Sequence, residues 1–164
     1  MKIGVYPGSF NPFHVGHFDV LQKASKLFDK IIILKKTNET TLIQMGNNYE
    51  QISGEKIIYN DPNSVFINST LGKTKIVFHS FNCLFYKRIK ELEELHGEFS
   101  GVIRGLRNGN DLQYEMNLQY TNEDLGINVP FVYFITDRKI SHISSSTIRE
   151  INSFEKNKNL PGKD

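Results

Sequence analysis

The chain has 164 residues, of which 38% are hydrophobic and 23% are charged, and its formal net charge at pH 7 is +2. This length is typical of one domain with a hydrophobic core, and so small a net charge argues against a nucleic-acid partner. No apolar run approaches the roughly 20 residues of a membrane span, the first residues do not resemble a secretory signal, and the single cysteine, Cys83, favours a reducing cytoplasm.

The first part of the chain predicts a strand, a turn, a helix and a second strand. Residues 2–6 (KIGVY) are expected to form a short buried strand that Pro7 and Gly8 end. A helix follows, because apolar residues recur there every three or four positions. Its predicted apolar stripe consists of Val15, Phe18, Leu21, Ala24 and either Leu27 or Phe28. Residues 31–34 (IIIL) are typical of a parallel strand that is buried on both faces.

Further along the chain, apolar runs alternate with amphipathic segments. The runs 76–78, 101–103 and 131–135 predict strands, and the segments 84–95, 111–125 and 145–151 predict helices. This alternation predicts an α/β fold with a doubly wound, five-stranded parallel sheet.

We expect a single domain over residues 1–156 and a flexible polar tail over residues 157–164. Residues 37–73 interrupt the alternation. There, EKIIY and SVFIN flank the turn-forming tetrapeptide NDPN, which predicts a β-hairpin insertion.

Residues 8–17 (GSFNPFHVGH) lie between the first strand and the first helix. Such a loop lies at the carboxyl end of a strand, the edge of an open α/β sheet where ligands bind. Helix N-termini there direct unpaired amides at anions. His14 and His17 are one helical turn apart, so both can face a bound triphosphate, and Gly16 leaves room for it. Two alternatives stay open for the histidines, a metal pair and ordinary core hydrogen bonding. Ser9 has the alternative of a plain turn hydroxyl.

Residues 102–115 (VIRGLRNGNDLQYE) again run from a strand end into a helix. The guanidinium groups of Arg104 and Arg107 suit phosphate oxygens at such a position. Asp111 and Glu115 are four residues apart and share one helix face. Solvated surface charge is the alternative interpretation for all four side chains.

Residues 142–150 (HISSSTIRE) place a run of hydroxyl groups where a loop opens a helix. Exposed amides and serine hydroxyls at a helix N-terminus can bind an anion. Helix capping without a ligand is the alternative. The three segments together predict a site for an anionic ligand.

In this order, GSFNPFHVGH, RGLRNGNDLQYE and ISSSTIRE resemble the phosphopantetheine adenylyltransferase family of the HxGH nucleotidyltransferases. The resemblance covers residues 1–34 and 101–151 and implies a Rossmann-like nucleotidyltransferase fold. It implies transfer of the adenylyl group of ATP to 4'-phosphopantetheine, which gives dephospho-coenzyme A and pyrophosphate in coenzyme A biosynthesis. The implied partners are ATP and a small phosphorylated acceptor, with no nucleic acid and no membrane. Mg²⁺ would be bound with ATP and not by protein side chains, and the chain would form a homo-oligomer, often a hexamer.

The resemblance also implies a role for individual residues. The catalytic residue would be His17. ATP would contact Ser9, Phe10, His14, His17, Gly105, Leu106, Arg107, Glu115, Ile140, Ser141, His142, Ile143, Ser144, Ser145 and Ser146. The acceptor would contact Ser9, Cys83 and Arg104, although a small buried residue is the alternative for Cys83.

The chain departs from the family in its middle, where the hairpin-like segment 51–71 replaces a family helix, and at two functional positions, one of which is His14, where most members carry Thr or a similar residue. Thr41 stands where the family carries a lysine that grips the reacting phosphates, and Lys35 or Lys36 is the alternative source of such a cation. Two other functions therefore stay open. One, which the altered middle region motivates, is nucleotidyl transfer to another phosphorylated acceptor, such as nicotinamide mononucleotide. The other, which the missing lysine motivates, is a nucleotide-binding module without turnover.

Overall fold

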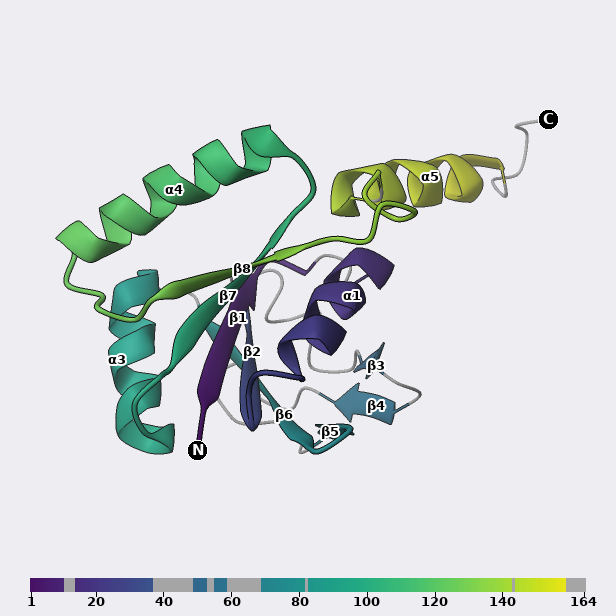
Figure 1. Ribbon diagram of the computed structural model, residues 1–164. Helices are drawn as coiled ribbons and strands as arrows, with labels where there is room; N and C mark the ends of the chain where they lie inside the picture. The colour runs from purple at the N-terminus through teal and green to yellow at the C-terminus, as the bar shows by residue number, and fades with distance from the viewer. Residues whose placement is uncertain are drawn as a thin grey trace.

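The computed structural model describes residues 1–10, 14–36, 49–52, 55–58, 69–81, 83–142 and 144–158. Within these ranges, six strands form one sheet in the order β5-β6-β2-β1-β7-β8 (Figure 1). They are β1 (Ile3–Gly8), β2 (Lys30–Lys36), β5 (Ser69–Leu71), β6 (Thr74–Phe81), β7 (Gly101–Leu106) and β8 (Phe131–Ile135). The five predicted parallel strands are confirmed, and β5 adds an antiparallel edge strand that the sequence analysis did not predict.

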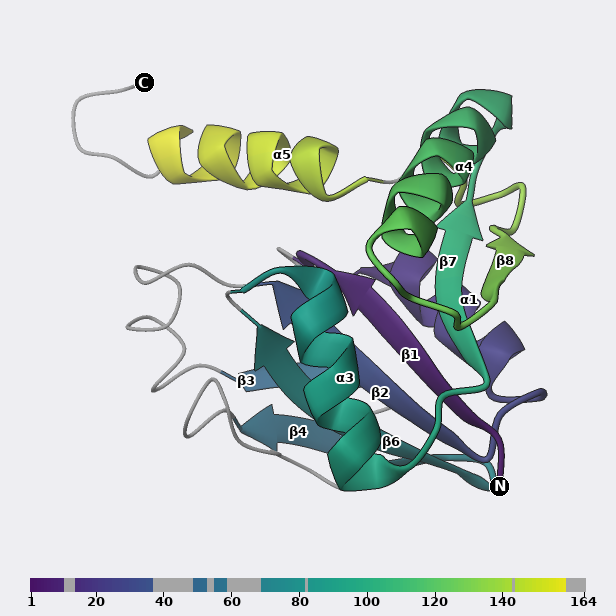
Figure 2. The ribbon, with the colours of Figure 1, turned by 90° about the vertical axis from the view of Figure 1, so that its left-hand side faces the viewer.

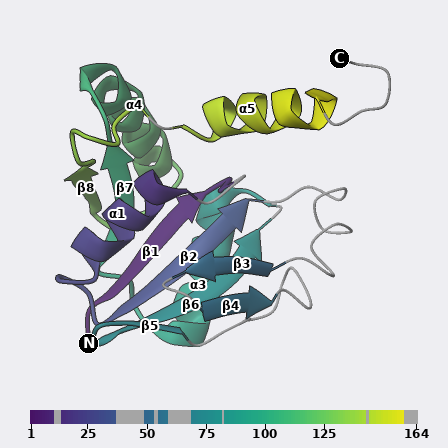
Figure 3. The same cartoon turned by 90° about the vertical axis from the view of Figure 1, so that its right-hand side faces the viewer.

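Helices cover both faces of this sheet. The helices that do so are α1 (Val15–Ala24), α3 (Phe85–His96) and α4 (Gly109–Asp124), whereas the last helix, α5 (Ser145–Lys158), does not lie on the sheet (Figure 1). Helix α1 lies on one face, and α3 and α4 lie on the other (Figures 2 and 3). The predicted doubly wound α/β fold is therefore confirmed.

The core is divided into two clusters by the sheet, and β2 contributes to both. Ile31 and Ile33 belong to the cluster under α1, whereas Ile32 and Leu34 belong to the cluster under α3. All four side chains are fully buried. The continuous apolar run in this strand therefore follows from the side-chain alternation of a strand with both faces covered.

The apolar stripe predicted for α1 is correct only in part. Leu21, Ala24 and Phe28 are buried, but Val15 is 47% exposed and Leu27 is 55% exposed. Val15 is the first residue of α1, at the end next to the chain's β1–α1 loop, and Leu27 follows the end of the helix, so neither packs on the sheet.

The predicted end of the first strand at Pro7 and Gly8 is wrong, because both residues belong to β1 and pair with the end of β2. β1 pairs with β7 only at Gly4 and Val5. Pro7 thus lies beyond the part of β1 that has a paired strand on both sides, where the missing N–H of a proline is tolerated.

A hairpin does occur within residues 37–73, but from different strands than predicted. β4 (Glu55–Ile58) contains most of EKIIY and pairs antiparallel with β3 (Tyr49–Ile52) upstream. The predicted turn 60–63 and second strand 64–68 lie outside the described residues. The hairpin lies on the side of the main sheet that carries α1 (Figures 1 and 3).

Helix α5 extends away from the sheet in all three views (Figures 1 to 3). It ends at Lys158, beyond the predicted helix end at Ile151, so it includes the first two residues of the predicted tail. The rest of that tail lies outside the described residues. None of the helices in the described ranges is both long and apolar enough to cross a membrane.

Candidate functional site

A cavity of about 350 Å³ lies at the carboxyl ends of β1 and β7. The structure brings the three predicted segments together there. The predicted site residues that line it are Ser9, Phe10, His14, His17, Arg104, Gly105, Arg107, Glu115 and Ser144. This is the edge of a parallel sheet at which ligands of α/β proteins bind.

His14 and His17 close the amino end of α1 together. The Nδ1 atom of His14 accepts a hydrogen bond from the amide of Gly16 at 3.0 Å, and Nδ1 of His17 accepts one from the amide of His14 at 3.1 Å. The two rings stack with their centroids 3.7 Å apart. Each imidazole thus satisfies a helix amide that would otherwise lack a partner.

Gly16 is required for this arrangement. A Cβ atom at this position would lie 2.9 Å from Cε1 of His14, which is closer than real Cβ contacts. A glycine at this position therefore leaves room for the His14 ring as well as for a nucleotide.

Burial keeps both imidazoles neutral at pH 7. It lowers the pKa of His17 to about 3, with further contributions from His14, Arg107 and Arg104. Burial and the charge of Arg107 also lower the pKa of His14. Because each Nδ1 accepts a backbone hydrogen bond, the proton of each neutral ring is assigned to Nε2. His17 is then a hydrogen-bond donor, and not a proton donor, toward an anionic ligand.

The structure does not support the interpretation of the two histidines as a metal-binding pair. Both Nδ1 atoms are occupied by backbone amides. Within the described part of the chain, no group of three or more His, Cys, Asp or Glu side chains is arranged to hold a metal ion.

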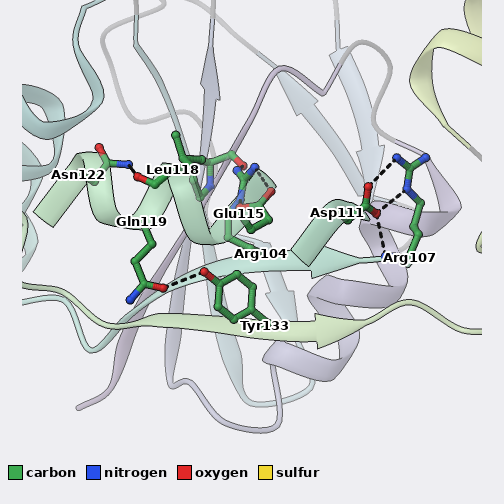
Figure 4. Close-up of polar contacts among 9 residues, drawn as sticks. Arg104, Arg107, Asp111, Glu115, Leu118, Gln119, Asn122 and Tyr133 are labelled. Atoms are coloured by element: carbon green, nitrogen blue, oxygen red, sulfur yellow. Dashed lines mark hydrogen bonds and ion pairs between the residues drawn. The ribbon is translucent and has the colours of Figure 1, made fainter. Parts of the chain in front are cut away.

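Arg104 and Glu115 form a buried ion pair between β7 and α4 (Figure 4). Nε and Nη2 of Arg104 each lie 2.7 Å from one oxygen of Glu115, and Nη1 donates to the carbonyl of Pro7 at 3.0 Å. Glu115 is only 5% exposed. The alternative of solvated surface charge is therefore wrong for this carboxylate, and the guanidinium links β7, α4 and β1.

Arg107 and Asp111 form the second pair, in the turn that opens α4 (Figure 4). Asp111 Oδ2 accepts from the backbone amide of Arg107 at 2.9 Å and from its Nε at 3.1 Å. The guanidinium is half-exposed, so it remains accessible to an anion in the cavity. Asn108 caps α4 through the amide of Asp111 and fixes the turn.

The residues after β8, which lead to the third segment, are held against α1 by a polar brace. Oδ2 of Asp19 accepts from Nζ of Lys23 at 2.8 Å and from the backbone amide of Asp137 at 2.9 Å. Lys23 also donates to the carbonyl of Ile135. Ser144 accepts from the amide of Thr147, as a capping serine does, and also lines the cavity.

Other predicted site residues lie elsewhere. Leu106, Ile140, Ser141, His142, Ser146 and Cys83 are described but are not among the lining residues. Ile143, the side chain of Ser145 and Thr41 are outside the part of the chain that the structure describes. The alternative of a buried Cys83 is wrong, because the thiol is exposed just after β6.

Sequence reasoning missed several residues that line the cavity. These are Tyr6, Pro7, Gly8, Val20, Tyr114 and Thr136. Tyr114 lies next to Glu115 and is 65% exposed, and an exposed aromatic ring beside a predicted site residue was the available signal. Thr136 directly follows β8. Arg104 is a predicted site residue because it follows the predicted strand 101–103, and the same rule would have identified Thr136.

Of the two lysines near the end of β2, Lys35 is buried and Lys36 is exposed. Nζ of Lys35 donates to the carbonyl of Phe10 at 3.1 Å. In this structure its ammonium group therefore contacts the backbone of the β1–α1 loop.

Comparison with known proteins agrees with this geometry. Residues 5–151 match the model of the cytidylyltransferase-like family. The chain is 33% identical over 158 residues to a phosphopantetheine adenylyltransferase of Mycoplasma capricolum subsp. capricolum, with 95% of this chain and 100% of that protein covered. It is 36% identical over 154 residues to one of Streptococcus pyogenes serotype M5, with 94% and 85% covered. These matches extend over nearly the whole chain, and they show that it belongs to the cytidylyltransferase-like family of nucleotidyltransferases, as its three motifs predict.

Proposed function

We propose that this protein is a phosphopantetheine adenylyltransferase. A phosphate oxygen of 4'-phosphopantetheine attacks the α-phosphorus of ATP, the bond to the β-phosphate bridging oxygen breaks, and dephospho-coenzyme A and pyrophosphate leave. The observation that carries the proposal is the convergence of the three motif segments on one cavity. The names of the two relatives favour phosphopantetheine over other acceptors.

The cavity fits phosphoryl chemistry because it offers hydrogen-bond donors and positive charge. The attacking phosphate oxygen is already anionic, so the reaction needs positioning and charge neutralisation more than a general base. The Nε2–H group of His17 and the guanidinium of Arg107 supply donors, and the N-terminus of α1 adds its partial positive charge. A neutral His17 suits this role, because it stabilises developing charge without losing its own proton.

Arg104 has a different position from Arg107. The guanidinium of Arg104 donates hydrogen bonds to the carboxylate of Glu115 and to the carbonyl of Pro7, and these bonds fix it at the cavity wall. We assign Arg104 to the acceptor and Arg107 to ATP. Fixed donors of this kind require no reorganisation when charge develops during the reaction.

Mg²⁺ belongs to this proposal as part of the Mg·ATP substrate. The carboxylates of Asp111 and Glu115, which line the cavity, are each engaged by an arginine. The ion would therefore be held by phosphate oxygens and water. There it would offset the charge of the triphosphate and the leaving pyrophosphate.

The test is pyrophosphate release by the purified protein with Mg·ATP and a panel of acceptors. We expect release, and formation of dephospho-coenzyme A, with 4'-phosphopantetheine. Release with nicotinamide mononucleotide or a polyol phosphate alone would assign the same chemistry to another acceptor. Tight ATP binding by calorimetry without release for any acceptor would identify a nucleotide-binding module and contradict the proposal.

The proposal includes a cytoplasmic homo-oligomer, a hexamer by resemblance. Leu112, Met116 and Tyr120 are four residues apart on α4 and 39%, 41% and 54% exposed, so they form an apolar stripe on its surface. Ile151 and Phe154 are exposed on α5. Monomers rarely expose large contiguous apolar patches, and equilibrium sedimentation measures the assembly directly.

A further inference from the structure

Lys35 is buried on the face of the sheet that α1 covers, next to the β1–α1 loop that lines the cavity. It pairs with Gly8 of β1 and is 7% exposed. Because side chains alternate along a strand, Lys35 shares its face with Ile31 and Ile33, the face covered by α1. A lysine is almost never buried without a partner for its ammonium group. Here a partner is the carbonyl oxygen of Phe10, 3.1 Å from Nζ.

Phe10 has an unusual backbone conformation. Its φ angle is 42°, and no other non-glycine residue in the described ranges has a positive φ. For a bulky residue this conformation is strained, and it persists only where the surroundings hold it. Strain of this kind gathers at functional sites, and Phe10 lines the cavity.

Contacts with both β1 and β2 help to hold Phe10 in this conformation. Phe10 is 2% exposed, and its ring lies against the end of β1, where a Cβ atom at Gly8 would come within 2.8 Å of the ring. Its carbonyl receives the charge-assisted hydrogen bond from Lys35, which is stronger than a bond between neutral groups.

The Phe10 ring in turn contacts the imidazole of His17. The ring centroids are 4.9 Å apart with an interplanar angle of 87°, an edge-to-face arrangement. The amide of His14 fixes Nδ1 of His17 from another direction. Together these contacts set the plane of the imidazole, and hence the direction of its Nε2–H bond.

We propose that Lys35 is a positioning residue for His17. Its ammonium group holds the Phe10 carbonyl, the Phe10 backbone places the ring, and the ring holds the imidazole toward the phosphates. The inference rests on the proposed function, in which His17 contacts the reacting triphosphate. Lys35 itself contacts no reacting atom in this scheme.

The first test compares Lys35→Met with Lys26→Met. The first variant keeps a linear apolar side chain and removes the ammonium group, whereas the second removes the same charge from an exposed position. We expect Lys35→Met to lower kcat about 10- to 100-fold, the cost of a small misplacement. KM for ATP should stay within about twofold. Lys26→Met should keep the wild-type kcat, and Lys35→Arg, which restores a cationic donor, should recover part of the loss.

The second test is a double-mutant cycle with His17→Ala. If Lys35 acts through His17, Lys35→Met has no further effect on kcat once the imidazole is gone. An equal fold-loss of kcat in both backgrounds would overturn the proposal, because it would mean that Lys35 acts on the phosphates directly or on the whole fold. Lys35→Gln, which keeps a neutral donor, replaces the Met variant if circular dichroism shows that the latter is unfolded.

A measurement that does not depend on catalysis tests this inference separately from the proposed function. Nitrogen NMR of His17 reports which ring nitrogen carries the proton. We expect one tautomer, protonated at Nε2, in the wild type and in Lys26→Met, and a mixture in Lys35→Met. A wild type that transfers adenylate to no acceptor would refute the proposed function and leave this readout intact. An unchanged His17 spectrum in Lys35→Met would refute the role of Lys35.

Discussion

At the scale of single residues, His14 and His17 each serve the helix and the cavity. Capping boxes usually combine Ser or Thr with Glu or Gln, which contribute oxygen acceptors. Two imidazoles can take the same places because each Nδ1 accepts a backbone hydrogen bond. The cap also orders the Nε2–H donors, so the local structure of α1 and the chemistry of the cavity depend on the same atoms.

Replacement of His17 tests this double role. His17→Ala removes both the donor to the phosphates and the acceptor for the His14 amide, whereas in His17→Asn the side-chain oxygen can still accept at the cap. We expect both variants to lower kcat by about 10²- to 10³-fold with little change in the affinity for ATP, because the lost interaction strengthens in the transition state. Steady-state kinetics and calorimetry measure the two quantities.

Thermal melts complete that comparison. Loss of a helix cap costs about 0.5–2 kcal/mol, so His17→Ala should melt below His17→Asn although both lose the donor. A variant that loses affinity for ATP and keeps its kcat would contradict the assignment of His17 to the transition state.

At the scale of elements, the cavity forms because three strand ends are tied to two helices. The Arg104–Glu115 pair joins β7 to α4, and the bond to Pro7 adds β1. Asp19 joins α1 to the segment after β8. Breaking a buried ion pair leaves an unpaired charge, which costs about 3–5 kcal/mol. These braces therefore hold the donors of different segments at fixed positions around one ligand.

Much of this arrangement could be predicted from the sequence, because it depends on local patterns. Apolar runs such as residues 31–34 predict parallel strands, and the carboxyl ends of parallel strands lie at one edge. The wrong predictions involve contacts between distant residues. Val20 packs on the sheet and Val15 does not, since the register of α1 is set by tertiary packing.

The hairpin and the role of Lys35 were harder to predict for the same reason. Ser53 and Gly54 separate β3 from β4, and a Ser-Gly pair is a turn signal that identifies the correct pairing. The bond from Lys35 to the Phe10 carbonyl joins positions 25 residues apart, and no periodicity encodes it. Pairings of this kind follow from the fold and not from the local sequence.

At the scale of the whole molecule, a second histidine cluster links α3 to the sheet. Nε2 of His79 lies 2.9 Å from Nε2 of His96, whose Nδ1 lies 2.8 Å from Nζ of Lys30. Arg88 lies on the other side of His79. Burial, then the neighbouring histidine and cations, lower the pKa of His79 to about 4, and burial with Lys30 and the other cations does the same for His96.

This cluster predicts that the fold loses stability in mild acid. The ordinary pKa of a histidine is 6.5, so between pH 6.5 and about 4 the unfolded chain binds protons that the folded chain excludes. Unfolding then takes up protons, and the free energy of unfolding must fall as the pH falls through this window. The slope is at most about 1.4 kcal/mol per pH unit for one proton.

Urea titrations across this window measure the slope, and His79→Gln tests its origin. His79 is 1% exposed, so its replacement by a side chain that does not titrate should reduce the dependence of stability on pH, while the lowered pKa values of His96 and His17 keep part of that dependence. His142→Gln, which removes an exposed histidine, serves as the matched control and should keep the wild-type slope. If His79→Gln were as sensitive to acid as the wild type, the cluster under α3 would not be the source of the loss. A slope that depends on His79 would show that packing of α3 on the sheet requires these imidazoles to stay neutral.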